Sequence, residues 1–74
     1  RILARPGLSP HVRELVAVGA LAAMRQQRQF VAHARGALHF GSSLAELREV
    51  LVTVFGAEPQ GTAEVDAWLQ LVRR

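Results

Sequence analysis

The run LVAVGALAAM at residues 15–24 places the strongest constraint on how this chain can fold. It is apolar on every side of a helix, so a helix formed here must be buried over most of its surface. Gly19 and the alanines near it favour close approach of a neighbouring helix. Half of the 74 residues are hydrophobic and 20% are charged. So short a chain has too little interior for that apolar surface, and we expect it to oligomerise or to belong to a larger unit.

Residue types that begin and end helices divide the chain into four helical stretches. Ser9 is a suitable N-cap, and Gly41 suits the end of a helix. Ser43 and Glu46 have the spacing of a capping box, which marks a helix start. Thr62 is expected to cap the last helix, after a turn rich in glycine and proline. No stretch has the pattern of a strand, so one all-α domain over residues 1–74 is predicted, with helices over 10–25, 28–40, 44–55 and 62–73.

His33 lies on the apolar side of the predicted helix over 28–40. At about 100° per residue, Phe30, Ala37 and Phe40 fall within roughly 60° of it. Two interpretations of this histidine stay open. It is either a core-edge side chain whose ring is satisfied by a backbone carbonyl, or a proton-transfer group, because imidazole changes charge near neutral pH.

Glu14 is the acidic exception in the apolar helix over 10–25. Ala17, Val18 and Leu21 lie on the same face as its side chain. One interpretation is an ordinary first-turn glutamate, which the helix dipole favours. The other is a carboxylate held in a partly apolar pocket, an environment suited to acid–base work. Trp68, on the last predicted helix, is expected to be a packing anchor.

Several kinds of chemistry have no support in the sequence. There is no cysteine, which excludes disulfides, thiol catalysis and cysteine-based zinc sites. No GxGxxG, P-loop or HExxH motif occurs. His33 and His39 point about 120° apart on their helix and cannot ligate one metal from it. We expect no metal and no cofactor, so any catalysis would be acid–base chemistry performed by side chains.

The charge pattern does not indicate a nucleic-acid partner. The net charge of +3 comes from nine arginines that are scattered along the chain without interleaved aromatic residues. No run of eighteen apolar residues and no signal-like segment is present, so a cytoplasmic protein without a membrane partner is expected. The sequence begins with Arg1 and not with methionine, which leaves room for residues upstream.

Four stretches in a fixed order resemble the carboxymuconolactone decarboxylase family, which also contains the alkylhydroperoxidase-D-like peroxidases. The likeness extends over about residues 5–60. The matching stretches are RPGLS at 5–9, RELVAVGALAA at 13–23, HARGALHFGSSLAELREVL at 33–51 and FGAEP at 55–59.

The resemblance implies an all-helical, four-helix domain that assembles as a homotrimer or homohexamer. It identifies Glu14 and His33 with the glutamate and histidine that the family uses in catalysis. Gln26 and Gln29 occupy the positions of the CxxC pair of the peroxidase members, and glutamine has no redox chemistry, so thiol peroxidase activity is not expected.

Two functions remain open. The resemblance implies a cofactor-free lyase that decarboxylates a small lactone or carboxylic acid in aromatic-compound catabolism, with Glu14 and His33 moving the proton. An arginine such as Arg25 or Arg28 would then hold a substrate carboxylate. The alternative is a non-catalytic oligomerisation or binding module derived from the family.

Overall fold

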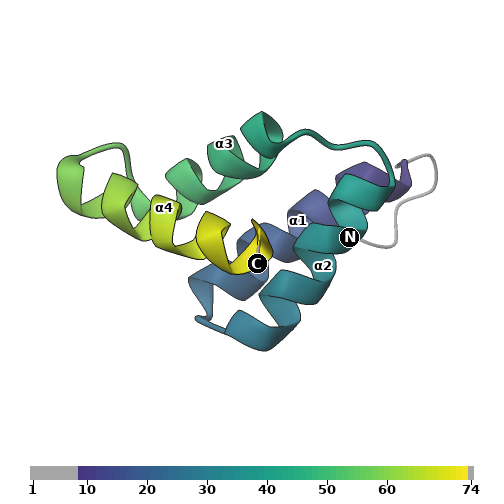
Figure 1. Cartoon of the computed structure of the whole chain (residues 1–74), viewed down its shortest axis with the longest axis horizontal. Helices are drawn as coiled ribbons and strands as arrows, with labels where there is room; N and C mark the ends of the chain where they lie inside the picture. Colours follow the sequence, from purple (N-terminus) through teal and green to yellow (C-terminus); the bar gives the residue numbers. More distant parts are fainter. Residues whose placement is uncertain (1–8, 74) are drawn as a thin grey trace.

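The computed structural model describes residues 9–73, and this part of the chain folds into four helices without a strand (Figure 1). Residues 5–8 of the first motif lie outside the described residues. The helices form two hairpins. In Figure 1, α1 and α2 lie side by side, and α4 runs back along α3. Helix α1 also packs against α3, and α2 against α4, which joins the hairpins. The helices are α1 (Pro10–Ala23), α2 (Gln27–His39), α3 (Leu44–Phe55) and α4 (Pro59–Arg73).

The core lies where the two hairpins meet, and aromatic rings form its centre. The ring of Phe30 meets the indole of Trp68 edge-on, with centroids 4.8 Å apart, and Phe55 lies 5.6 Å from the same indole. Trp68 is 3% exposed, so its expected role as a packing anchor fits the structure. The buried apolar residues come from all four helices and are Val18, Ala22, Phe30, Ala34, Ala37, Leu47, Leu51, Val65, Trp68 and Val72.

The expected boundary between α2 and α3 is confirmed. The hydroxyl of Ser43 accepts a hydrogen bond from the amide of Glu46 at 3.1 Å, and the Glu46 carboxylate accepts one from the Ser43 amide at 2.8 Å. Together these two bonds form the predicted capping box. Gly41 follows α2 with a φ of +108°, a conformation that glycine adopts without strain.

Two expected caps differ from the structure. Helix α4 begins at Pro59 and not after Thr62. Proline fits the first turn of a helix, because the backbone N–H groups there make no hydrogen bond within the helix. The Thr62 hydroxyl donates to the carbonyl of Pro59 at 3.1 Å, inside the helix. Ser9 is the N-cap residue of α1, as expected, but its hydroxyl makes no capping bond and instead lies 3.1 Å from Nδ1 of His11.

The α1–α2 connection lies earlier in the chain than expected. Helix α1 ends at Ala23, not at residue 25, and α2 begins at Gln27, not at residue 28. Arg25 makes this compact turn with a φ of +60°. None of the helices in the described part of the chain has the length and hydropathy that a membrane span requires.

The turn at Arg25 is tied to α4 by an ion pair. The Arg25 guanidinium donates to both oxygens of Glu64, at 2.9 and 3.3 Å, and lies 5.2 Å from the centre of the Phe55 ring. Glu64 also accepts a hydrogen bond from the indole N–H of Trp68 at 3.3 Å. The hydrogen bond from Arg25 is the main cause that lowers the pKa of Glu64 below its ordinary value of 4.5.

This lowered pKa predicts a small acid-dependent loss of stability. A carboxylate whose pKa is lower in the folded state contributes stability above its unfolded pKa, and that contribution disappears as the pH falls through the folded value. Between pH 7 and pH 3, we expect Tm to fall less in Glu64→Gln than in the unmodified protein. Thermal unfolding followed by circular dichroism measures this. Glu49→Gln, an exposed glutamate on α3, should keep the original pH dependence.

Candidate functional site

Glu14 and His33 are in direct contact between α1 and α2. The distance from Oε1 of Glu14 to Nδ1 of His33 is 2.6 Å. Both side chains belong to one chain, so the contact forms without a neighbouring subunit. Because Nδ1 of His33 binds this carboxylate, the interpretation in which a backbone carbonyl is the partner of Nδ1 is wrong.

The register of the first hairpin explains the contact. Glu14 lies nine residues before the end of α1 (23 − 14), and His33 lies six residues after the start of α2 (33 − 27). The remaining offset of three residues is about 4.5 Å along the axes, which a glutamate side chain can span. The helix bounds predicted from the sequence give an offset of about 9 Å, because they end the first helix two residues later and begin the second helix one residue later.

His33 is less buried than the sequence pattern predicted. Its side chain is 45% exposed, and that of Glu14 is 26% exposed. The buried face of α2 is centred on Phe30, Ala34 and Ala37, roughly 65° from His33 around the helix. His33 therefore lies at the edge of the core, with one side of its ring open to solvent.

The pair has the geometry of an oriented acid–base group. Nδ1–H of His33 donates to the Glu14 carboxylate, which fixes the orientation and the tautomer of the ring. Nε2 makes no hydrogen bond with residues 9–73 and is free to exchange a proton with a bound molecule. The carboxylate also stabilises the imidazolium that forms when Nε2 takes up a proton.

Among the residues that the structure describes, the others considered from the sequence make no hydrogen bond or ion pair with Glu14 or His33. Arg25 is bound to Glu64 at the far end of the hairpin, which leaves Arg28 as the less constrained of the two proposed anchors. Gln26 is the N-cap residue of α2, and Gln29 lies in its first turn. Both glutamines are exposed. Within residues 9–73, no three acidic or histidine side chains are placed to hold a metal ion.

Gly36 is a site residue that the sequence reasoning missed. It lies in the middle of α2, and its backbone directly faces the carboxylate of Glu14. The signal was present in the sequence, since glycine disfavours a helix interior and is retained there for packing or function. Its partner could not be read from the sequence, because the hairpin register decides which α1 residue it meets.

The fold and the site together define a small all-helical protein with a glutamate–histidine pair between its first two helices. The model of the carboxymuconolactone decarboxylase family matches residues 1–73, and the chain belongs to this family. The resemblance seen in the motifs is thereby confirmed. Neither a curated protein nor a solved structure gave a match.

Proposed function

We propose that the protein is a cofactor-free acid–base lyase that removes CO2 from a small lactone acid or related carboxylic acid, in the catabolism of aromatic compounds. The observation that supports this proposal is the 2.6 Å contact between Glu14 and His33, beside an open Nε2. The proposed substrate class rests on membership of the carboxymuconolactone decarboxylase family. The reaction requires a proton donor and no redox step, which suits a chain without cysteine.

The proposed step moves one proton and one electron pair. The bond between the carboxylate and its carbon breaks, CO2 leaves, and the electron pair stays on that carbon, delocalised into the unsaturated ring. Nε2–H of the His33 imidazolium then protonates the carbon. Glu14 holds the ring in place and offsets its positive charge before the transfer. A proton from water restores the imidazolium, so the sum is a carboxylate and a proton giving CO2 and a C–H bond.

A direct assay tests this function. Purified protein is incubated with a carboxymuconolactone and with a small panel of related lactone acids, and CO2 release is measured. We expect release above that of a protein-free control for at least one lactone acid. Release that equals this control for every compound would contradict the lyase and leave the binding module as the function.

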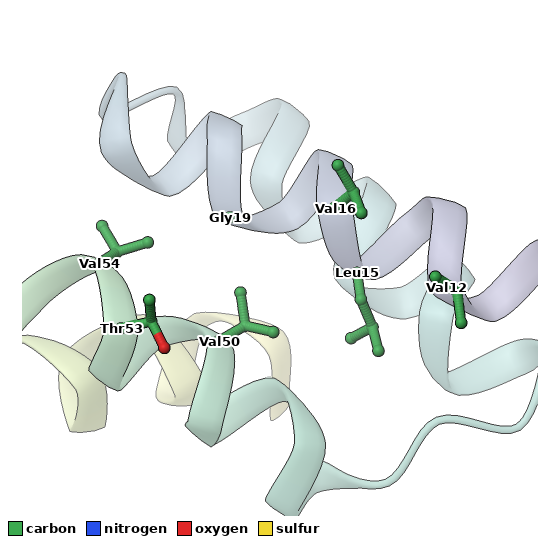
Figure 2. A pocket seen from close by; sticks show the side chains of 7 residues that line it. All are labelled: Val12, Leu15, Val16, Gly19, Val50, Thr53 and Val54. Carbon is green, nitrogen blue, oxygen red and sulfur yellow. The ribbon is translucent and has the colours of Figure 1, made fainter. Parts of the chain in front are cut away.

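The binding module has its own supporting observation, an apolar groove between α1 and α3 (Figure 2). The groove has a volume of about 290 Å³, and no charged side chain lines it. In Figure 2, Leu15 extends from α1 toward α3, and Val50 rises from α3 toward α1. The lining residues are Val12, Leu15, Val16, Gly19, Val50, Thr53 and Val54.

We propose that a second copy of this chain covers the groove, as part of a homotrimer or homohexamer. The chain has more apolar surface than its small core can bury, and Met24, Phe40 and Leu44 are also exposed. Closed symmetric assemblies are the usual way for one chain to cover such surface with itself. Self-association is compatible with the lyase and would be the main property of the module.

Val16→Glu should weaken this association. Val16 lines the groove and is half-buried, so a charge there would be desolvated in the assembly while remaining tolerable in the free chain. Light scattering at micromolar concentration should show an oligomer for the unmodified protein and a smaller species for Val16→Glu. Ala63→Glu, on an exposed position of α4, should leave the mass unchanged. A folded monomer for the unmodified protein would contradict the proposal.

A further inference from the structure

Gly36 of α2 lies against Oε2 of the Glu14 carboxylate, whereas His33 contacts Oε1. A Cβ placed on Gly36 would lie 3.1 Å from Oε2 and 3.3 Å from Cδ of Glu14. Both distances are shorter than ordinary van der Waals contacts between carbon and its neighbours. A side chain at position 36 would therefore require the Glu14 carboxylate to shift by a few tenths of an ångström.

Backbone conformation does not account for the glycine. Gly36 lies within a regular α-helix, and it is not among the glycines with positive φ. Alanine would form this helix better than glycine does. Glycine at position 36 is thus unfavourable for the helix. The contact with the Glu14 side chain is the feature of its surroundings that accounts for it.

We infer that Gly36 is a positioning residue, which sets the glutamate–histidine pair by leaving room for the Glu14 carboxylate. The 2.6 Å contact between Glu14 and His33 cannot shorten further, because it is already at the short end for a charge-assisted hydrogen bond. Oε1 of the same carboxylate contacts the ring, so a shift that makes room for a new Cβ also moves the partner of Nδ1. Glu14 is 26% exposed, so its side chain has solvent into which it can turn. This inference rests on the proposed function for its catalytic meaning, but the geometry can be measured without turnover.

The tautomer of His33 reports on the pair directly. When the ring is neutral, the Glu14 carboxylate favours the form that carries the proton on Nδ1. Nitrogen-15 NMR of the imidazole distinguishes this form from the one protonated on Nε2. We expect the Nδ1–H form to predominate in the unmodified protein and its ratio to the Nε2–H form to fall by about tenfold or more in Gly36→Ala, which corresponds to loss of one charge-assisted hydrogen bond.

Gly19→Ala is the matched control. Gly19 is the glycine inside α1, and a Cβ there would approach Cγ1 of Val50 at 3.2 Å, with no atom of Glu14 or His33 within 4 Å. Both variants replace a helical glycine with a better helix former, so thermal unfolding should show that both still fold. The His33 tautomer should change in Gly36→Ala alone.

The outcomes separate this inference from the proposed function. If Gly36→Ala keeps the tautomer ratio of the unmodified protein, Gly36 does not position the pair and the inference is wrong. If the ratio changes as expected but no lactone acid releases CO2, the positioning role stands and the lyase fails. If both hold, CO2 release by Gly36→Ala should be reduced by about tenfold to a hundredfold, since small displacements of a catalytic group have effects of this size.

Discussion

Gly61→Ala is expected to destabilise the fold by about 3 kcal/mol or more, the largest effect on stability that the structure predicts. Gly61 is buried in the first turn of α4, where the chain has just reversed after α3. A Cβ on Gly61 would lie 2.3 Å from the carbonyl oxygen of Gly56 and 2.4 Å from that of Phe55. Both obstacles are backbone, so the turn itself would have to move. A loss of this size removes much of the stability of a typical small domain.

Urea unfolding followed by circular dichroism measures this effect. Gln60→Ala is the matched control, because it places alanine one position earlier, at an exposed site in the same helical turn. The control should unfold at the midpoint of the unmodified protein or slightly above it. A Gly61→Ala midpoint equal to that of the control would show that the turn accommodates a side chain, contrary to the packing described above.

His33→Ala is expected to reduce CO2 release by about 10²- to 10⁴-fold, the range that a positioned acid–base group contributes. Glu14→Gln should also reduce it strongly, because glutamine has nearly the same shape but cannot stabilise an imidazolium. Neither side chain is part of the buried core, so helical content should be preserved. Initial rates at saturating substrate, with circular dichroism on the same samples, measure both properties.

His39→Ala provides the control for His33→Ala. His39 is the other histidine of α2, at the end of the helix, and its ring contacts Phe40 and not Glu14. Its removal should leave the rate within about twofold, since surface substitutions away from a site have small effects. An equal loss of rate in both histidine variants would mean that helix damage, and not loss of the proton donor, causes the effect.

The fold could be predicted from the sequence to the extent that local signals determine it. The capping box of Ser43 and Glu46 and the glycine after α2 depend on neighbouring residues, and both were placed correctly. The start of α4 was placed three residues late. The sequence pattern predicts Pro59 in the turn before this helix, whereas Pro59 opens the helix itself. A proline can have either role, and the local sequence does not decide between them.

The sequence names the two residues of the candidate pair but not their geometry. Glu14 and His33 were identified from their faces and from the resemblance, yet their direct contact depends on where the hairpin turns. A shift of the helix ends by one or two residues halves the expected axial offset. The exposure of His33 likewise depends on which residues of α2 face the core directly. A helical wheel shows which side of the helix is apolar, but not which residue on that side is buried most deeply. The role of Gly36 could not be predicted for the same reason, because it depends on a contact with Glu14 on another helix.

The most direct test of the central claim is a double-mutant cycle on CO2 release. Rates are measured for the unmodified protein, His33→Ala, Glu14→Gln and the variant that carries both substitutions. If Glu14 acts through His33, the double variant should be about as slow as His33→Ala alone, because the carboxylate has no ring left to orient. If the two losses multiply instead, the residues contribute independently, and the account of Glu14 and His33 as one acid–base unit is wrong.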